Sequence, residues 1–442
     1  MSLSFIPLGG FGEVGKNCLA VRIDDDLIIL DAGVHLENYV SLTGHDFFKQ
    51  KHVFRKLVNA QAIPDLRPIK KYLSSLRAVF CSHGHLDHIG ALPFFSKKFR
   101  CPVYATPYTA SLIRSFCKDH KASLNVIAVS SSSTIRISPK LSVEFIHVAH
   151  SIPQSSILAL HTPYGVVLYA NDYKNDQTPP FDEPTDIPRL KELSGKVNTL
   201  LIDSLYAQKE GLVPSEELAR QELLSLKESL SSHRAIIVST FSSHISRLQS
   251  ICDLADSLGR EVVFLGRSLT RYALVAKETG VVNLFSRAKF LSYARQVNRF
   301  LQNISSPEKY LIVVTGHQGE PGAVLDRMSK GEFSFTPQDV VVFSCSIIPT
   351  PQIISQRAQL EHNLKKQRVR IISDVHASGH GHSQDIQELI SLLQPKNLIP
   401  SHADKSMQDA CISQAKKLGY SLNDSSHKII TLQSGKQTNI FD

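Results

Sequence analysis

Short apolar runs, each ended by a polar turn, dominate the first part of the chain. Cys18 to Ile23 and Leu27 to Leu30 flank Asp24-Asp25-Asp26, a pattern that predicts a β-hairpin with a short polar loop. Further runs of strand type lie at residues 77–81, 141–148, 166–170 and 199–202. Several are followed by helical patterns, so we expect a mixed α/β architecture that begins with strands.

The pattern changes after Val213. Ser215 precedes a segment whose apolar residues recur at the helical period, which predicts a helix capped by this serine. Helices then alternate with near-continuous apolar runs, at residues 235–240, 261–266, 310–316 and 339–344. Such runs are typical of strands buried on both faces of a parallel sheet. We therefore expect a separate, doubly wound α/β module here.

After His362 the pattern of the first part returns, with RVRIISDVHASGHGH, the helix-like QDIQELISLL, and NLIPSHAD. These segments indicate a first domain that is interrupted by the module and completed by the C-terminal strands. The single-sequence pattern shows neither an internal repeat nor a low-complexity tract, which fits a globular chain of two or three modules.

Composition narrows the class of protein. The 442 residues carry 49 basic and 40 acidic side chains, a net charge of +9, which favours an anionic partner such as nucleic acid. The seven cysteines include no C-x-x-C pair, so we expect neither a disulfide framework nor a thiolate zinc site, and a reducing cytoplasm fits best. No secretory signal or membrane-length apolar run is present in the sequence.

The strongest chemical signal follows the predicted strand at 77–81. Ser82-His83-Gly84-His85-Leu86-Asp87-His88 places four metal-ligating side chains within six residues. One turn can direct such a cluster toward two adjacent metal positions, and imidazole with carboxylate is a ligand set that suits zinc. A solvated loop that contains histidines by chance is the weaker alternative.

Three further candidate ligands occur in the same context. His150, Asp172 and His402 each come just after a predicted strand, where loops gather on one edge of a sheet. Each alone is more simply an ordinary surface or core residue. Together with the first cluster, they predict one metal centre assembled from distant parts of the chain.

These motifs resemble the β-CASP nuclease branch of the metallo-β-lactamase fold, and within it the ribonuclease J family. The segments that carry the resemblance are LGGFGEVGKN at 8–17, SHGHLDHIGAL at 82–92, AHSIP at 149–153, TGHQGEP at 315–321 and HASGH at 376–380. The absence of the extra C-terminal domain of bacterial members favours the archaeal form. The resemblance implies a four-layer αββα metallo-β-lactamase domain, residues 1–207 and 364–442, with an inserted α/β β-CASP domain at 208–363.

The resemblance also implies the ligand sets. It assigns one zinc to His83, His85 and His150, the second to Asp87, His88 and His402, and makes Asp172 the bridge between them. Manganese and magnesium are the alternative ions. Two divalent ions can activate water at neutral pH and neutralise a phosphodiester under in-line attack. The activity implied is hydrolysis of single-stranded RNA, chiefly 5′-to-3′ from monophosphate ends and also endonucleolytic.

The catalytic residues implied are Asp172, His380 and Asp203. His380 is the last histidine of the family motif H-x-S-G-H, and it is the candidate general acid for the leaving oxygen. Asp203, in DSLY after the run at 199–202, matches the acidic residue thought to orient such groups. The alternative is that His380 caps a turn and Asp203 merely ends a strand.

A 5′-phosphate pocket is implied as well. Its candidate residues are Ser243, His244, Arg267, His376, Ser378 and Gly379. Small residues let backbone N–H groups approach a phosphate, and a planar guanidinium suits a terminal phosphate. The alternative for Ser243 and His244 is that they only cap a helix. The segment at 279–307 is rich in basic and aromatic residues and also has two interpretations. These residues either bind single-stranded nucleic acid or form an amphipathic helix with a buried face, and we favour the helix.

Some positions depart from the family pattern. His402-Ala403-Asp404 replaces the usual H-G-E or H-G-D, and DSLY replaces an acidic residue followed by two hydroxyl residues. TGHQGEP has no catalytic role in this interpretation, and Asp31 is expected to support the metal loop from behind the ligands.

Three other functions compete with the ribonuclease. They are a DNA-processing nuclease of the same fold, a small-molecule thioester or lactam hydrolase, and a non-catalytic RNA-binding subunit. All seven ligand positions are occupied by ligand-type residues, which argues against the last of these. The resemblance further implies a homodimer.

Overall fold

The computed structural model describes residues 2–43, 54–348, 350–422 and 426–441. The chain forms two compact units. Unit 1 consists of Met1–Gln177, Glu183–Val213 and Gly379–Asp442, and unit 2 consists of Thr178–Asp182 and Pro214–Ser378. Each unit has its own sheets and its own hydrophobic core, so we describe them separately.

Unit 1 contains two seven-stranded sheets. The first has the order β20 (Thr438–Phe441), β1 (Leu3–Gly9), β2 (Cys18–Ile23), β3 (Asp26–Leu30), β4 (Leu76–Phe80), β5 (Val103–Ala105) and β6 (Val126–Ala128). The second has the order β19 (Lys428–Ile429), β18 (Asn397–Ser401), β11 (Val197–Asp203), β10 (Gly165–Ala170), β9 (Ser156–Thr162), β8 (Leu141–His147) and β7 (Thr134–Ser138). The predicted hairpin is confirmed, because β2 and β3 pair antiparallel.

The two sheets face each other across a hydrophobic core. Alternate side chains of both sheets fill it, including Phe5, Phe80, Phe145 and Tyr169, all of which are fully buried. This is the expected result of period-two alternation on strands that bury one face against another sheet.

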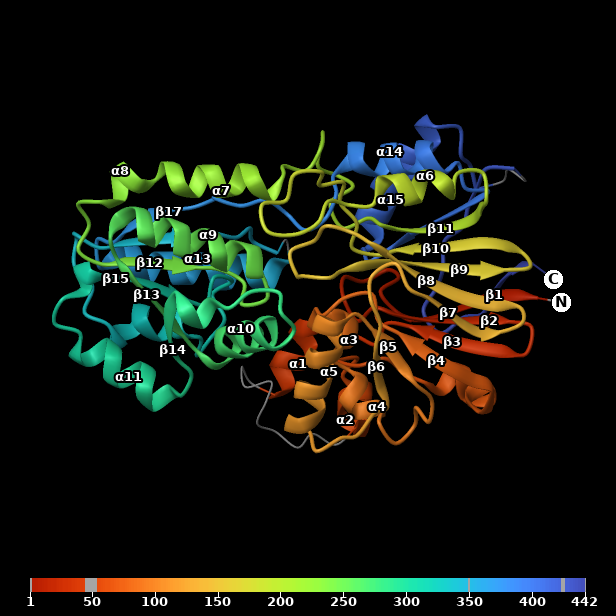
Figure 1. Cartoon of the computed structure of the whole chain (residues 1–442), viewed down its shortest axis with the longest axis horizontal. Coiled ribbons are helices and arrows are strands. Elements are labelled where there is room, and N and C mark those ends of the chain that lie inside the picture. Colours follow the sequence, from red (N-terminus) through yellow and green to blue (C-terminus); the bar gives the residue numbers. More distant parts are fainter. Residues whose placement is uncertain (1, 44–53, 349, 423–425, 442) are drawn as a thin grey trace. The chain divides into compact units, whose positions relative to one another are not determined.

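Helices cover the outer face of each sheet, which gives four layers (Figure 1). Over the second sheet lie α6 (Ile187–Glu192), α14 (Ser383–Leu393) and α15 (Lys405–Lys417), which share a second core with it. The first sheet carries α1 (Leu36–Thr43), α2 (Phe54–Asn59), η1 (Arg67–Ser75), α3 (Leu86–Ile89), α4 (Leu92–Phe95) and α5 (Pro107–Asp119). The expected αββα arrangement is confirmed.

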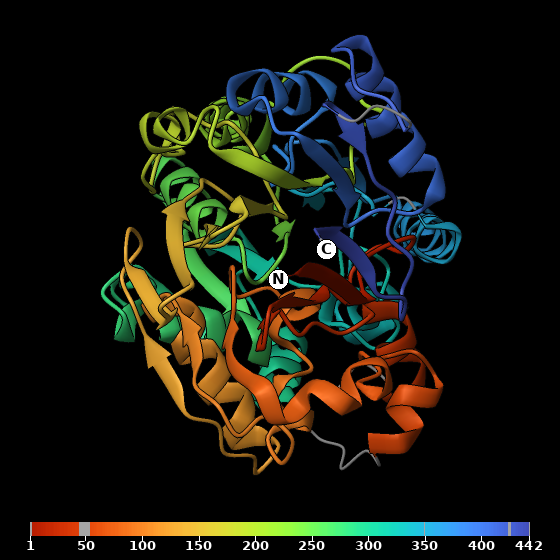
Figure 2. The same cartoon turned by 90° about the vertical axis from the view of Figure 1, so that its right-hand side faces the viewer.

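The C-terminal segment completes unit 1. Its strands β18 and β19 extend the second sheet, where β18 runs parallel to β11. Strand β20 pairs antiparallel with β1, so the first and last strands of the chain lie side by side (Figure 2). Residues distant in sequence thereby reach the same sheet edges, which is what assembles the site described below.

Unit 2 is built on a six-stranded sheet in which all neighbouring strands are parallel. The order is β14 (Ala288–Leu291), β13 (Glu261–Leu265), β15 (Tyr310–Val314), β12 (Ile236–Ser239), β16 (Val340–Phe343) and β17 (Arg370–Ile372). The predicted doubly wound α/β module is therefore present. Strand β17 belongs to this sheet, although the resemblance to the family ends the inserted domain at residue 363, before β17. That domain boundary remains a prediction.

The helical segments of unit 2 surround this sheet (Figure 1). They are α7 (Glu216–Ser225), α8 (Lys227–Leu230), α9 (Ile245–Leu258), α10 (Arg267–Glu278), η2 (Leu284–Ser286), α11 (Ala294–Asn303), η3 (Pro307–Lys309), α12 (Val324–Arg327), η4 (Met328–Glu332) and α13 (Pro351–Lys366). Helix α7 begins as predicted, because the Ser215 hydroxyl accepts a hydrogen bond from the Glu217 N–H.

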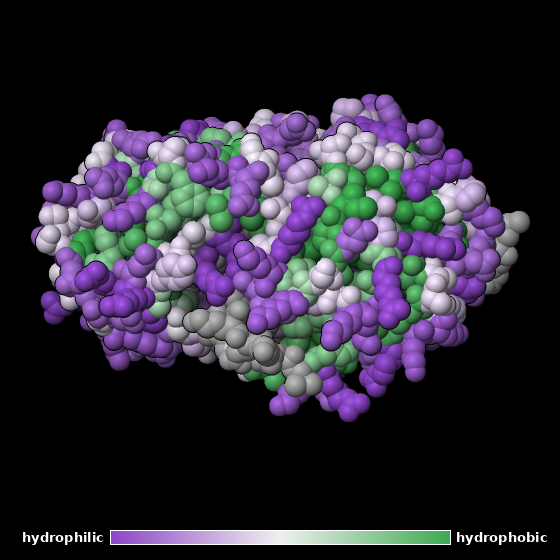
Figure 3. All heavy atoms as spheres, turned by 60° about the horizontal axis from the view of Figure 1, so that its bottom comes forward, coloured by the Kyte–Doolittle hydropathy of each residue, from purple (hydrophilic) through white to green (hydrophobic). Residues whose placement is uncertain are grey.

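One face of the molecule carries both polar and hydrophobic residues. Figure 3 shows polar side chains over much of one face, with hydrophobic residues gathered between them. All seven cysteines are free and buried. Among the described residues, no helix combines the length and the apolar character needed to cross a bilayer.

Candidate metal centre

The candidate ligands gather at one place in unit 1, although they come from four parts of the chain. The loop after β4 supplies His83, His85, Asp87 and His88, and the residues after β8, β10 and β18 supply His150, Asp172 and His402. Each follows the end of a strand, where side chains are held by the sheet but are free of its hydrogen-bond ladder. The structure thus brings together all seven residues singled out from the sequence.

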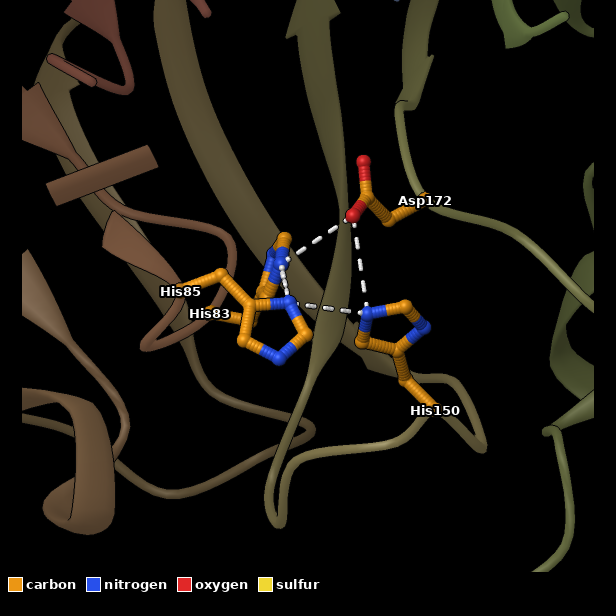
Figure 4. A group of neighbouring side chains, drawn as sticks. All are labelled: His83, His85, His150 and Asp172. Carbon is orange, nitrogen blue, oxygen red and sulfur yellow. Dashed lines mark hydrogen bonds and ion pairs between the residues drawn. The ribbon is translucent and has the colours of Figure 1, made fainter. Parts of the chain in front are cut away.

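The first group consists of His83, His85, His150 and Asp172, whose side chains point toward one another (Figure 4). His85 Nδ1 lies 3.1 Å from His83 Nε2 and 3.2 Å from His150 Nε2. Asp172 Oδ2 lies 3.2 Å from His83 Nε2 and 3.5 Å from His150 Nε2. Four potential ligand atoms therefore surround one point.

These distances fit a tetrahedral metal ion. With zinc bonds of about 2.0 Å, neighbouring ligand atoms of a tetrahedral site are about 3.3 Å apart. Hydrogen bonds alone satisfy the group poorly, because a ring nitrogen has one in-plane donor or acceptor position and His85 Nδ1 faces two ring nitrogens. The donor set therefore matches a bound cation, and it indicates metal binding.

Outer contacts set the orientation of the ligand rings. His150 Nδ1 lies 2.6 Å from the carbonyl oxygen of Gly379, to which it donates. His88 Nδ1 likewise lies 2.8 Å from Asp31 Oδ2, and Asp31 also accepts from Ser82. Because each Nδ1 carries the proton, the Nε2 lone pair is directed into the cluster, as a metal ligand requires. Asp31 therefore lies where the sequence analysis expected a supporting residue.

The second group consists of Asp87, His88 and His402. Asp87 Oδ2 lies 3.6 Å from His88 Nε2 and 3.8 Å from His402 Nε2, a looser arrangement than the first group. Asp172 connects the two groups, because its Oδ1 lies 3.1 Å from His88 Nε2 while its Oδ2 faces His83 and His150. One carboxylate with an oxygen toward each group is the arrangement expected of a bridging ligand.

Asn17 is a site residue to which the sequence analysis assigned no role. This side chain is buried, and its Nδ2 lies 2.9 Å from His88 Nε2 and 2.7 Å from His402 Nδ1, with Oδ1 3.0 Å from the same Nδ1. An Nδ1–H of His402 that donates to Oδ1 leaves Nε2 free to face Asp87. The only signal in the sequence was its place at the end of the motif LGGFGEVGKN.

His380 lies beside the cluster. Its Nδ1 is 2.7 Å from Asp203 Oδ2, and its Nε2 is 3.8 Å from Asp172 Oδ2. Asp203 is held in turn by the N–H groups of Leu205 and Tyr173. His380 thus contacts a carboxylate through one nitrogen and faces the metal cluster with the other.

Burial and neighbouring charges shift the pKa values of these histidines in opposite directions. Burial, reinforced by adjacent histidines, holds the pKa of His85 and His150 well below the usual range, so both are neutral, as ligands must be. Burial also disfavours the charged form of His380, but the Asp203 and Asp172 carboxylates outweigh it and raise the pKa of His380 to about 9.

Unusual backbone conformations aim several of these side chains. Asp31, Asp172 and His402 all have positive φ angles, of 58°, 61° and 54°. Such angles are uncommon for residues other than glycine, and they occur where the surrounding structure enforces them, often at functional sites. Two glycines permit close approaches: a Cβ on Gly33 would lie 1.6 Å from the Asp87 carbonyl oxygen, and one on Gly379 would lie 2.6 Å from His150 Cε1.

The phosphate-pocket candidates lie in unit 2, except Gly379. Ser243 and His244 follow β12, Arg267 follows β13, and His376 and Ser378 follow β17. All come after carboxyl ends of parallel strands, the edge at which such sheets bind ligands. The rings of His244 and His376 are 6.2 Å apart and perpendicular. His244 is the N-cap residue of α9, but its side chain makes no capping hydrogen bond.

The remaining sequence features have structural contacts. In the segment at 279–307, Phe290 of strand β14 stacks on Phe285 and Phe264, and Arg287 pairs with Asp253. The expected amphipathic helix is confirmed only in part, because the helix is limited to Ala294–Asn303 and Tyr293 is exposed. In TGHQGEP, the Gln318 side chain bonds the backbone of residues 346 and 348. Asp404, which follows Ala403 at the position that departs from the usual glycine, caps α15 by accepting from Met407 N–H.

Comparison with protein-family models places three matches along the chain. The metallo-beta-lactamase superfamily matches residues 11–174, the ribonuclease J beta-CASP domain matches residues 233–357, and the Zn-dependent metallo-hydrolase RNA specificity domain matches residues 366–423. A crystal structure of a protein of unknown function from Enterococcus faecalis covers all of both chains with a TM-score of 0.66 and 16% identity, which supports the fold alone. Fold and site together define a metallohydrolase of the metallo-β-lactamase superfamily.

Curated relatives narrow the family. Ribonuclease J of Pyrococcus abyssi is 38% identical, with 95% of this chain and 93% of the relative aligned. Ribonuclease J of Methanocaldococcus jannaschii is 37% identical over 97% of both chains, and ribonuclease J2 of Bacillus subtilis is 30% identical over 96% of this chain and 73% of its own length. The chain belongs to the ribonuclease J family.

Proposed function

We propose that the protein is a zinc-dependent ribonuclease that hydrolyses RNA phosphodiester bonds, chiefly as a 5′-to-3′ exonuclease and also as an endonuclease. Membership of the ribonuclease J family supports the reaction class. The observation that carries the proposal is Asp172, whose two carboxylate oxygens face two separate groups of ligand-type side chains.

We assign one ion to His83, His85 and His150 and a second to Asp87, His88 and His402, with Asp172 shared. When bound, a pair of divalent ions makes water nucleophilic at neutral pH and neutralises charge on a phosphodiester. Zinc is the proposed ion because three neutral imidazoles and one carboxylate at tetrahedral spacing surround the first position. Manganese and magnesium are the alternatives.

His380 is the proposed general acid. Its Nε2 faces the cluster, while Asp203 holds its Nδ1 at 2.7 Å and so fixes both the ring and the tautomer. A proton at Nε2 is then placed for transfer to the 3′ oxygen that leaves during hydrolysis. Asp203 positions this ring and does not itself transfer a proton in the proposal.

A 5′-monophosphate preference is assigned to Ser243, His244, Arg267, His376, Ser378 and Gly379. Two observations support this assignment. The residues follow the carboxyl ends of the parallel strands, and the rings of His244 and His376 lie close together. A cytoplasmic homodimer is the proposed state of the protein, and light scattering of the purified chain in solution tests the dimer.

The function is tested with protein of measured zinc content. RNA and DNA of one sequence, carrying a 5′-monophosphate or a 5′-hydroxyl and labelled at the 3′ end, are digested side by side. We expect RNA cleavage that depends on zinc, and faster shortening of the 3′-labelled strand when its 5′ end carries a monophosphate. Cleavage of DNA alone would replace the proposal with the DNA-processing nuclease, and binding of RNA without cleavage by zinc-loaded protein would replace it with the non-catalytic subunit.

A further inference from the structure

A fully buried arginine lies in unit 2, away from the surface. Arg247 of α9 has no exposed area, and it forms a two-pronged pair with Glu216, with Nε to Oε1 and Nη2 to Oε2 both at 2.8 Å. An arginine is rarely buried in this way unless every donor is used and the charge is paired. The Glu216–Arg247 pair therefore has a structural role in the core of unit 2.

The remaining donor of Arg247 reaches toward the segment that contains HASGH. Its Nη1 lies 2.8 Å from the carbonyl oxygen of Val375 and 2.7 Å from Ser344 Oγ. Ser344 also donates to the Val375 carbonyl, at 3.0 Å. Val375 directly precedes His376, so the guanidinium fixes the backbone at the point where the phosphate-binding segment begins.

Glu216 contacts a second pocket residue. His244 Nε2 lies 3.3 Å from Glu216 Oε2, the oxygen that also accepts from Arg247 Nη2. His244 and Arg247 both belong to the start of α9, and both are buried. One carboxylate and one guanidinium therefore hold the His244 ring on one side and the residue before His376 on the other.

We propose that the Glu216–Arg247 pair is a specificity-determining positioning pair, which sets the separation of His244 and His376 and thereby the preference for a 5′-monophosphate end. The inference rests on the proposed function, because it concerns the phosphate pocket assigned there. The pair does not touch RNA. It acts through the two histidines, whose rings lie 6.2 Å apart.

The charge of the pair is suited to this role. The Arg247 charge lowers the pKa of Glu216 well below its usual range against the effect of burial, so the carboxylate is ionised and the pair is neutral overall. A neutral, hydrogen-bonded pair can hold both histidines rigidly without adding net charge beneath an anion site.

The principal test is Arg247→Lys, which keeps one positive charge but cannot bond Glu216, Ser344 and Val375 at once. KM and kcat are measured on matched RNAs with a 5′-monophosphate or a 5′-hydroxyl. We expect KM for the monophosphate RNA to rise about tenfold to a hundredfold, the loss that follows misplacement of charged hydrogen bonds, with the 5′-hydroxyl RNA little changed.

A double variant, Glu216→Leu with Arg247→Met, removes both charges together and so avoids an unpaired buried ion. It is expected to fold and to show the same selective loss. The matched control is Arg220→Gln with Asp253→Asn, which removes a partly exposed pair between the same two helices, α7 and α9. The control should keep the wild-type preference to within about twofold. Circular dichroism and zinc content are measured for every variant.

The outcomes separate the two proposals. If the wild-type protein treats both 5′ ends alike, the proposed phosphate pocket fails. If the wild type prefers the monophosphate and the folded variants keep that preference, or lose both activities equally, the positioning role of the pair is overturned.

Discussion

The candidate metal ligands of unit 1 and the buried Glu216–Arg247 pair of unit 2 both form dense groups of polar side chains. The two groups differ in their bonding. In unit 1, His83, His85 and His150 turn ring nitrogens toward one another at 3.1–3.2 Å around His85 Nδ1. In unit 2, the two-pronged bond between Arg247 and Glu216 joins donors to acceptors.

The difference shows how a binding centre is distinguished from an internal scaffold. Lone pairs that converge on one point repel each other unless a cation occupies that point, so the first arrangement is complete only with a metal ion. A network in which donors and acceptors match is complete by itself and serves to fix the parts it joins. Removing a residue should therefore abolish chemistry in unit 1 and shift specificity in unit 2.

The largest effect is expected for His83→Ala or Asp87→Ala. Each removes a proposed ligand, and we expect kcat to fall by roughly a thousandfold or more while RNA binding survives. Metal content, turnover and RNA affinity are measured together. His427→Ala, which changes an exposed histidine, is the control. Normal turnover in either ligand variant would end the assignment of the metal centre.

Next in size is His380→Ala. Loss of a positioned acid should lower kcat by about a hundredfold to ten-thousandfold, with normal zinc content. Asp203→Asn should produce a smaller loss, because it leaves the ring but weakens its orientation through Nδ1. A fall in zinc content that accounts for the lost rate would instead make His380 a ligand of the cluster, a role compatible with its grouping with Asp172 and His402.

A smaller effect is expected for Asn17→Ala. The variant loses the contacts to His88 and His402, and we expect zinc affinity at the second position to fall about tenfold to a hundredfold. Competition with a coloured chelator measures this affinity without reference to activity. Asn198→Ala is the control, because this buried asparagine bonds Thr199 and Asn397 instead. Unchanged affinity would remove Asn17 from the centre.

The smallest effect concerns stability in acid. Burial opposes ionisation of Glu144, but bonds from His161 and Arg189 lower its pKa from the usual 4.5 to about 2. A carboxyl whose pKa is lowered by folding stabilises the native state above its unfolded pKa, and that stability is lost as the pH falls from about 4.5 toward 2. Glu144→Gln should reduce the slope of unfolding free energy against pH in this window. An unchanged slope in denaturant titrations would contradict the assignment.

The local sequence pattern predicted many of the strands and helices, because their formation depends on residues that are close together in the chain. Alternation and apolar runs predicted β2, β3 and the four buried strands of the parallel sheet, and Ser215 predicted the start of α7. The candidate metal ligands were predictable for a similar reason. Histidines and an aspartate that lie so close together, from His83 to His88, have few explanations other than metal binding. The role of Asn17 was not predictable from the sequence. An amide side chain can bond many kinds of partner, and only folding brings His88 and His402 next to it.

The sequence by itself determined which elements form, which side chains can ligate a metal, and which family the chain resembles, since propensity, periodicity and residue chemistry act over a few positions. Only the tertiary structure decided which atoms meet. The bond from His150 to Gly379, the contact of Asn17 with His402, and the pairing of Arg247 with Glu216 and Val375 all join distant residues. Such contacts depend on how sheets and helices pack, and packing is a property of the whole chain that no short segment encodes.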